Sequence, residues 1–288
     1  MESRRRIDEA LSGALSLAEA GAPPRIAAAL WHAVFPGGGR LRPRLTLAVS
    51  RACGEDQPRL GDAAAAAIEF MHCASLVHDD LPCFDDADMR RGRPSVHRAF
   101  GQPIAVLAGD ALIVLAFETL VRAAPGAPHR LASLAGIVAR SVGLPGGIAA
   151  GQAWECEPAL DLSEYHRAKT GVLFAAATEA GAAAAGHEPG PWRRLGERLG
   201  EAYQVADDLR DVLSDPAEIG KPVGRDAALR RRSAVEDLGV AGALAHLDRL
   251  VADAVESIPV CPGAADLRAI VQAESGRFAP VPAIRVAA

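Results

Sequence analysis

Apolar residues recur at helical spacing through most of the chain, in blocks of roughly fifteen to twenty-five residues that glycine and proline interrupt. Breaks of this kind stand at 36–39, 125–128 and 145–147, where helices are expected to end. The pattern predicts helices over residues 4–20, 25–34, 40–53, 60–78, 103–123, 129–142, 147–156, 162–185, 191–213, 233–256 and 264–274.

The predicted helices form one continuous series without a boundary between domains. No serine- and glycine-rich linker, low-complexity tail or long block of like charge divides them, and no fixed-period repeat is visible. We therefore expect a single domain over residues 1–288. The segment 215–232 is polar and irregular, which predicts a mobile loop or lid.

Composition supports an all-α fold. The 288 residues are 50% hydrophobic and 4% aromatic, and they are rich in alanine and leucine with few runs of β-branched residues. A chain of this length and hydrophobic content buries a large core. The net charge of -5 argues against a nucleic-acid partner, which would favour a basic face.

Cysteine usage and hydropathy indicate a cytoplasmic protein. The five cysteines are an odd number, and none shows the paired short spacing of a zinc or redox site, so reduced thiols are expected. The basic cluster near the N-terminus has no apolar segment of a secretory signal behind it. The stretch 171–186 is mostly alanine and carries Glu179, so no stable membrane insertion is expected.

Candidate chemistry is concentrated in two aspartate-rich segments, 79–92 and 207–211, each of which follows a strongly apolar predicted helix. Carboxylates at this density beside an apolar core repel one another unless cations neutralise them. Ligation by oxygen alone, without histidine or cysteine at ligand spacing, suits a hard ion such as Mg²⁺ that bridges to phosphate oxygens. The two segments therefore predict a metal-bridged phosphate site.

The spacing of the aspartates indicates how they could cooperate. Asp207 and Asp211 are four residues apart and share one helix face. A proline interrupts the first segment, so a bulge must bring Asp79 and Asp85 together. Cations should surround any bound diphosphate, and the candidates are Arg40, Arg42, Arg90, Arg91, Lys169 and Lys221.

Two other interpretations use the same residues. A single aspartate pair at a helix end is usually a solvated cap, but two dense segments with a Gly-Gly-x-Arg-x-Arg run upstream are hard to explain in that way. His78 followed by Asp79 also fits a metal-dependent phosphohydrolase of the HD type, in which both side chains ligate metal. That interpretation leaves the second aspartate segment unexplained.

Residues Leu76–Ser95 closely resemble the first aspartate-rich motif of trans-prenyl (polyprenyl) diphosphate synthases, and Tyr203–Asp211 resemble the second. The resemblance extends over about residues 30–275. It implies an all-α bundle of the isoprenoid-synthase type around a deep central cavity, assembled as a homodimer. It also implies Mg²⁺-dependent, head-to-tail condensation of isopentenyl diphosphate with an allylic diphosphate, in the manner of a bacterial geranylgeranyl diphosphate synthase.

Matched position by position, the resemblance implies a role for each candidate residue. About three Mg²⁺ ions would bind the allylic diphosphate, and this group would itself accept the final proton once it has departed, so no side-chain base is required. By position, the metal ligands would be Asp79, Asp80, Asp85, Asp207, Asp208 and Asp211, of which Asp79, Asp85 and Asp207 bind directly; Arg90, Lys169 and Lys221 would hold the allylic diphosphate; Arg42, His72 and Arg91, with Arg40 close by, would hold the isopentenyl diphosphate; and Thr170 and Gln204 would face the allylic cation.

Two positions depart from the family pattern. The family usually has lysine in Gly-Gly-Lys-Arg where this chain has Gly39. A weaker grip on isopentenyl diphosphate is therefore expected, or compensation by Arg40 or Arg44. Glu155 stands where aspartate is more usual in a Gly-Gln-x-x-Asp pattern, and its carboxylate is kept.

Product length should be set on the helix that leads into the first segment. Ser75 and Ala74 lie about one turn (~5.4 Å) below Asp79, and both are small. In the resembling family, a bulky aromatic residue at the Ala74 position stops growth at fifteen carbons, so its absence here implies a twenty-carbon product. Phe70 and Met71, one turn deeper, could form the floor or could be ordinary core residues.

Several alternatives stay open on the sequence alone. A farnesyl diphosphate synthase would differ only in product length. A terpene cyclase or head-to-head condensing enzyme uses the same ionisation but needs no second cationic pocket, and Arg42, His72 and Arg91 argue against it. A non-catalytic subunit of a heteromeric synthase usually lacks one aspartate segment, whereas both are complete here, and Gly39 is the only feature in its favour.

Overall fold

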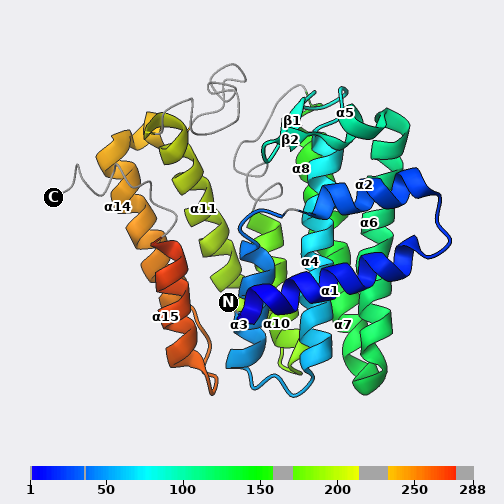
Figure 1. Cartoon of the computed structure of the whole chain (residues 1–288). Helices are drawn as coiled ribbons and strands as arrows, with labels where there is room; N and C mark the ends of the chain where they lie inside the picture. The colour runs from blue at the N-terminus through cyan, green and yellow to red at the C-terminus, as the bar shows by residue number, and fades with distance from the viewer. Residues whose placement is uncertain (1, 36, 158–170, 214–232, 277–288) are drawn as a thin grey trace.

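The computed structural model describes residues 2–35, 37–157, 171–213 and 233–276, and it is built almost wholly of helices, which confirms the all-α prediction (Figure 1). Within the described residues, the exception is one short antiparallel hairpin. In chain order the elements are α1 (Glu2–Glu19), α2 (Pro24–Val34), α3 (Leu41–Ala52), α4 (Pro58–Asp79), β1 (Met89–Arg90), β2 (Arg93–Pro94), α5 (Val96–Phe100), α6 (Gln102–Ala123), the 3-10 helix η1 (Ala124–Gly126), α7 (Pro128–Val142), α8 (Ile148–Trp154), α10 (Val172–Ala184), the 3-10 helix η3 (Gly190–Trp192), α11 (Arg193–Leu213), α14 (Ala234–Glu256) and α15 (Ala264–Ser275).

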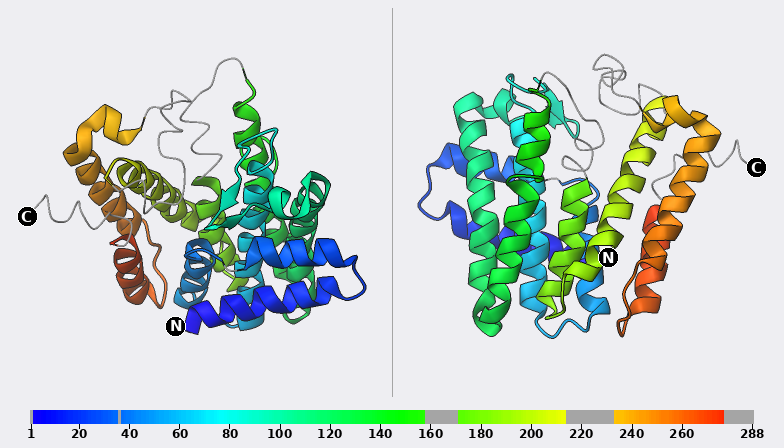
Figure 2. Two further views of the ribbon diagram at one scale, coloured as in Figure 1. Left: turned by 45° about the horizontal axis from the view of Figure 1, so that its top comes forward. Right: turned by 180° about the vertical axis from the view of Figure 1, so that it is seen from behind.

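Helix α4 runs through the middle of the bundle, where it packs against α3, α6, α7 and α10 and is crossed by α1 (Figures 1 and 2). Every residue from Ala63 to Met71 is buried, including Glu69. A helix that is apolar on all sides belongs in a core. A buried glutamate needs a partner, which the start of α3 supplies.

Small residues let α3, α10 and α11 approach one another closely. A Cβ added at Gly181 of α10 would stand 2.4 Å from the Thr46 carbonyl oxygen of α3, and one added at Gly196 of α11 would stand 2.4 Å from the Ala175 Cα of α10. Glycine is therefore required at both contacts. Alanine occupies most other positions of α10, so this helix joins α3 and α4 to α11 at short range.

Helices α11 and α14 pack together over a second apolar cluster and lie to one side of the bundle (Figure 1). Leu41 and Tyr203 contact both clusters, so the two apolar regions are continuous. Helix α14 bends at Gly239, whose φ is 67°, and α15 then returns to pack against α3. The expectation of a single domain over residues 1–288 stays a prediction.

Two helical segments are long and apolar enough to span a membrane by length and composition, 58–79 and 102–126. The apolar window of the first is 78% buried inside the bundle, as expected of a core helix. That of the second is only 44% buried, because α6 exposes Leu107, Val114 and Val121 on one face. Two such helices are weak evidence for a membrane span.

Candidate functional site

The first aspartate segment begins where α4 ends and folds back on itself. Asp79 is the last helical residue, and a series of turns follows it. The Asp85 amide donates to the Asp79 carbonyl oxygen at 2.8 Å, and the Ala87 amide donates to the Asp80 carbonyl oxygen at 3.2 Å. The expected bulge is therefore present, and it brings Asp85 beside Asp79.

Asp80 turns inward and is 2% exposed. Arg90 of β1 binds it through Nε, at 3.0 and 3.2 Å from the two carboxylate oxygens, and also through Nη2. Burial raises the pKa of Asp80, while the hydrogen bonds from Arg90 act in the opposite direction. This pair anchors the hairpin to the end of α4, whereas Asp79 and Asp85 are half-buried at the edge of the motif.

Arg91 and Gly92 form the two-residue turn between β1 and β2, with φ angles of 53° and 74°. A turn with two left-handed residues matches the twist of paired antiparallel strands. Arg91 Nη2 lies 3.3 Å from Nε2 of His72, two turns before the end of α4. The hairpin thus sends two consecutive arginines to two places, Arg90 to Asp80 and Arg91 to His72.

Arg42, on the first turn of α3, completes a cationic group with His72 and Arg91. Its guanidinium carbon lies 4.5 Å from the ring centroid of Phe174 and 5.8 Å from that of Tyr203, contacts that orient it. Burial, and then the charges of Arg42 and Arg91, lower the pKa of His72 well below its ordinary value. The imidazole is therefore neutral at pH 7 and can hydrogen-bond an anion whose charge the two guanidinium groups balance.

Arg40 and Arg44 are engaged elsewhere. Arg40 is fully buried and donates through Nη1 to Oε1 of Glu69 at 2.6 Å and through Nη2 to a backbone carbonyl of α2 at 2.8 Å. Arg44 pairs with Glu274 of α15. Both arginines that were expected to compensate for Gly39 are therefore bound to carboxylates of the protein, and a substrate role for Arg40 stays a prediction.

The second aspartate segment lies on the last two turns of α11. Nε2 of Gln204 donates to Asp208 Oδ1 at 3.1 Å, and the first backbone amide of α14 donates to Asp208 Oδ2 at 2.8 Å. Asp208 therefore ties α11 to the start of α14. Asp207 lies 3.3 Å from Nη1 of Arg210, and Asp211 is exposed.

The described His, Cys, Asp and Glu side chains do not form a preformed group of three or more around a metal position. The aspartates come instead from α4 and α11, whose C-terminal ends lie at the same end of the molecule (Figures 1 and 2). Oxygen donors on two separate supports fit Mg²⁺, which keeps part of its water shell and bridges to phosphate. Lys169, Thr170 and Lys221 lie outside the described residues.

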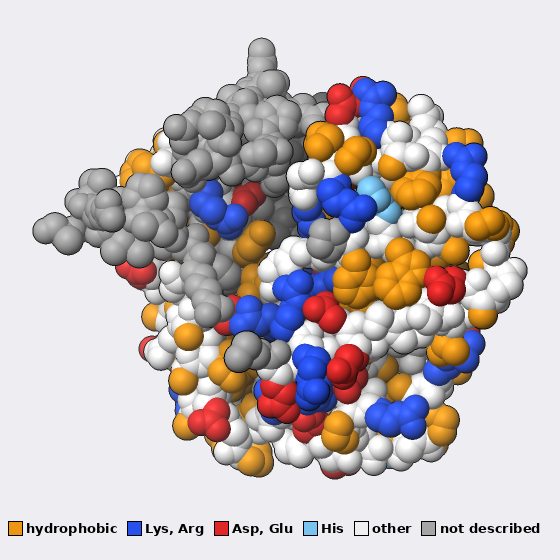
Figure 3. Space-filling view, in the orientation of Figure 1, with side chains coloured by type: hydrophobic (Ala, Val, Ile, Leu, Met, Phe, Trp, Pro, Cys, Tyr) orange, Lys and Arg blue, Asp and Glu red, His pale blue; other side chains and the backbone are white. Residues whose placement is uncertain are grey.

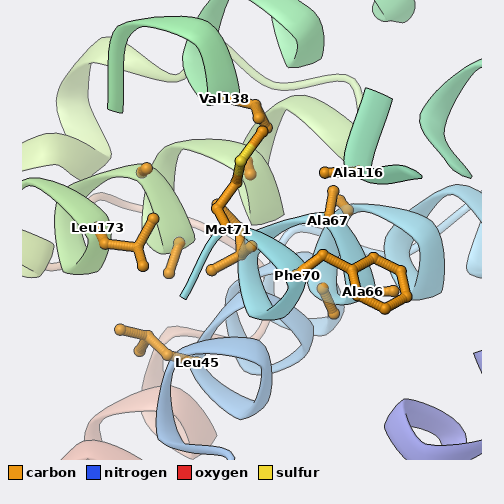
Figure 4. Packing of buried hydrophobic residues seen from close by; sticks show 14 of the residues in the cluster. Leu45, Ala66, Ala67, Phe70, Met71, Ala116, Val138 and Leu173 are labelled. Atoms are coloured by element: carbon orange, nitrogen blue, oxygen red, sulfur yellow. The ribbon is translucent and has the colours of Figure 1, made fainter. Parts of the chain in front are cut away.

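Below the first segment, α4 presents a small residue and then a larger one. Ala74 is 2% exposed and Met71 is 1% exposed. In Figure 4 the Met71 side chain extends toward Val138 of α7, whereas the Phe70 ring points to another side of α4. Ser75 is half-buried, and its hydroxyl donates at 2.9 Å to the carbonyl three residues earlier. Of the two candidate floor residues, Met71 thus faces α7.

His78 is directed toward α6. Its Nε2 lies 3.2 Å from the Val106 carbonyl oxygen, and a Cβ added at Gly109 would stand 2.0 Å from the same atom. The close approach at Gly109 therefore makes room for the imidazole between the two helices. This position gives no support to a metal pair of the HD type. Glu155 follows α8 and accepts a hydrogen bond from Gln152 at 3.2 Å.

Some contributors to the site were not predicted. The Phe174 ring under Arg42 carries no motif, because aromatic residues on an apolar face are usually core. Arg4 of α1 was also missed: its Nη1 donates to the Gly38 carbonyl oxygen at 3.1 Å, across 34 positions of sequence. Figure 3 shows arginine side chains, with acidic side chains among them, gathered where the N-terminal end of α1 meets α3.

Comparison with known proteins agrees with this arrangement. Residues 23–241 match the family model described as polyprenyl synthetase. The chain is 52% identical to the geranylgeranyl diphosphate synthase of Cereibacter sphaeroides, over 97% of this chain and 98% of that protein. It is 51% identical to the geranylgeranyl diphosphate synthase of Rhodobacter capsulatus, over 98% of each. A solved geranyltransferase from Helicobacter pylori, complexed with magnesium and isoprenyl diphosphate, superimposes with a TM-score of 0.76 at 31% identity, over 88% of this chain and 89% of that one.

Proposed function

This chain belongs to the polyprenyl synthetase family and is a prenyltransferase, and we propose that it condenses isopentenyl diphosphate head to tail with allylic diphosphates to yield geranylgeranyl diphosphate. The observation that carries the proposal is the hairpin, which places Arg90 at the first aspartate segment and Arg91 beside His72. An acidic group that can bind Mg²⁺, side by side with a cationic group, suits two diphosphate substrates. A cyclase would need only one of them.

The first of these groups serves the allylic diphosphate. Asp79, Asp85 and Asp207 would hold Mg²⁺, about three ions by family resemblance, and the bound metal would supply positive charge to the leaving diphosphate. Arg90 shares that charge by hydrogen bonding, and the resemblance gives Lys169 and Lys221 the same task. The site's donors are thus arranged for charge that develops as the carbon–oxygen bond breaks.

The second group serves isopentenyl diphosphate without a metal. Arg42 and Arg91 supply charge, and the neutral His72 supplies a hydrogen bond. The double bond of isopentenyl diphosphate then attacks the allylic carbon, and the new chain loses a proton to the departed diphosphate. Gln204, whose amide is held by Asp208, supplies a dipole near the allylic cation, and no side chain moves a proton.

Product length follows from the small residue at position 74. Ala74 lies five residues before Asp79, which is about 7.5 Å along the helix axis, and Met71 lies about 12 Å down. The chain passes Ala74 and stops near Met71 and Val138. Farnesyl diphosphate is the alternative product, and it would result if the bottom of the product cavity lay closer to Asp79.

A homodimer is proposed from α6, and the cytoplasmic location expected from the sequence stays a prediction. Leu107, Val114 and Val121 are seven residues apart and are 52%, 65% and 55% exposed, so they form one apolar stripe along the helix. A second copy of α6 would bury this stripe across a two-fold axis. Replacing Val114 by glutamate should then give a monomer in sedimentation analysis, and an unchanged mass would exclude this face.

The test of the reaction uses the purified chain, labelled isopentenyl diphosphate, and dimethylallyl, geranyl or farnesyl diphosphate in turn, with Mg²⁺ or with EDTA. We expect a Mg²⁺-dependent twenty-carbon product from all three starters. A fifteen-carbon product would indicate the farnesyl diphosphate alternative. No condensation with any starter would indicate a non-catalytic subunit, and release of phosphate without chain growth would indicate a phosphohydrolase.

A further inference from the structure

Gly39 stands where the family usually has a lysine, so one positive charge is absent at this position. No steric requirement explains the glycine. An added Cβ there would meet no atom within 4 Å, and Gly39 is absent from the left-handed glycines of the described chain. The backbone therefore accepts a side chain at this position. A binding site that has lost a cation at an open position either binds more weakly or receives the charge from another element.

Arg4 of α1 reaches this position. Its Nη1 donates to the Gly38 carbonyl oxygen at 3.1 Å, and its Nε donates to Asp8 at 2.8 Å. A carbonyl oxygen lies about 3 Å from the next Cα, so this Nη1 is within about 6 Å of the Gly39 Cα. A lysine ammonium group at position 39 would stand at about the same distance.

The other side of the same peptide faces the isopentenyl diphosphate group of residues. A Cβ added at Gly38 would stand 3.2 Å from the guanidinium carbon of Arg91, which in turn contacts His72. Gly38 thus accepts a hydrogen bond from Arg4 and lies near the guanidinium group of Arg91. The two guanidinium groups lie within about 10 Å of each other, by adding these contacts to the dimensions of one residue.

The neighbouring cations are committed to other partners. Arg40 and Arg44 bind Glu69 and Glu274, as described above. Arg6, half a turn from Arg4 on α1, is bound by Glu55 and Asp62. The Arg4 side chain is 45% exposed, so it keeps a solvent-facing edge from which a phosphate can be met.

We propose that Arg4 supplies, from the first turn of α1, the positive charge on the isopentenyl diphosphate that a lysine at position 39 would otherwise provide. The inference rests on the proposed function and adds a positioning and charge-bearing residue to its second substrate. Asp8 orients the guanidinium through Nε, while Nη1 is held at the Gly38 carbonyl oxygen.

The test compares Arg4→Gln with Arg5→Gln. Glutamine keeps an amide that can donate to the Gly38 carbonyl but removes the charge. Arg5 is the matched control. Its side chain is 73% exposed, and its ion pair with Glu9 is long, with 3.9 Å between Nε and the carboxylate oxygen. We expect Arg4→Gln to raise the KM for isopentenyl diphosphate about 3- to 10-fold, with the allylic KM and kcat unchanged, because a half-exposed charge is partly screened. Arg5→Gln should change none of these values.

Gly39→Lys provides the decisive second measurement. Added to Arg4→Gln, it should return the KM for isopentenyl diphosphate to near the wild-type value; added to the wild-type chain, it should change that KM less than twofold. If Gly39→Lys in the wild-type chain strongly lowered the KM for isopentenyl diphosphate, the positive charge would be missing from the wild-type site. If the effects of the two substitutions were additive in the double variant, Arg4 would only support the structure of the loop. Either result overturns the inference.

The inference and the proposed function fail in different ways. Wild-type turnover with an unchanged KM in Arg4→Gln overturns the inference alone. Absence of condensation by the wild-type chain overturns the proposed function and the inference with it. Thermal unfolding of each variant checks that the fold is intact, and Gly39→Lys in the wild-type chain still tests the inference where Arg4→Gln is poorly folded.

Discussion

Replacing Ala74 by phenylalanine should shorten the product from twenty to fifteen carbons. Ala74 is about 7.5 Å below Asp79 along α4, and Met71 is about 12 Å below it, so a ring at position 74 raises the floor by about 4.5 Å. That rise is comparable with one five-carbon unit. The ring would occupy space that the growing chain uses when alanine is present.

Stability distinguishes this outcome from ordinary overpacking. A phenyl ring forced into a closed core costs about 1–3 kcal/mol, which lowers the melting temperature by roughly 2 °C or more for each kcal/mol. A ring that enters the path of the product meets no packed side chain, and the free energy of unfolding should change by less than about 0.5 kcal/mol. Because Ala74 is only 2% exposed, a ring at this position cannot turn into solvent. It must enter either packed core or the path of the product, and the change in stability distinguishes the two.

The assay sizes the dephosphorylated products after incubation with labelled isopentenyl diphosphate and dimethylallyl diphosphate. Ala74→Ser is the matched control and should still make twenty carbons. Met71→Ala should lengthen the product, at a cost of about 2–5 kcal/mol in stability because Met71 is buried. A twenty-carbon product from Ala74→Phe, together with a loss of about 1–3 kcal/mol, would show that position 74 faces packed core and would refute the placement.

Three further outcomes are expected. Glu69→Gln removes the hydrogen-bonded carboxylate of the buried Arg40 and leaves only Asp8, 3.5 Å from its Nε, so urea denaturation should show a loss of about 3 kcal/mol. A change below about 1 kcal/mol would contradict the pairing with Glu69. Unfolded His72 takes up a proton below about pH 6.5, whereas the folded imidazole, with its lowered pKa, does not. The free energy of unfolding should therefore fall as the pH drops below about 6.5, by up to about 1.4 kcal/mol per pH unit. His72→Gln should remove this part of the slope in denaturation curves measured between about pH 5 and 8. EDTA should abolish condensation yet move the melting temperature by less than about 1 °C, because α4 is held by apolar contacts; a large shift would show that metal binding stabilises the fold.

Helical periodicity and the glycine and proline breaks were enough to predict the long helices. The ends of α2, α3, α6, α7 and α14 lie within two residues of the predicted ends. The pattern over 162–185 was only partly tested, because part of it lies outside the described residues. The hairpin and α5 were missed, since elements of two to five residues are too short to show a period.

The site shows the same division between local and tertiary information. Proline within the first aspartate segment was sufficient to predict the bulge that brings Asp85 to Asp79. The sequence could not predict that Arg40 is buried against Glu69 while Arg42 joins the cationic group, because both arginines follow the same glycine run. A left-handed backbone at Arg40, with φ of 51°, sends its side chain into the core, where Glu69 meets it. Contacts between distant segments, such as Arg4 with Gly38, leave no local pattern at all.

The turn at Arg91 and Gly92 bears on how accurately the two reactants are aligned. Arg90 and Arg91 are joined by one peptide bond, so their Cα atoms stay about 3.8 Å apart whatever the surrounding helices do. Under the proposed assignment, one residue grips each substrate. Motion of the bundle then moves both arginines together and leaves the distance between their Cα atoms unchanged. The spacing of the two backbone attachment points is therefore set by covalent geometry, and a single residue inserted between the two arginines would disturb it more than a much larger shift of the whole hairpin.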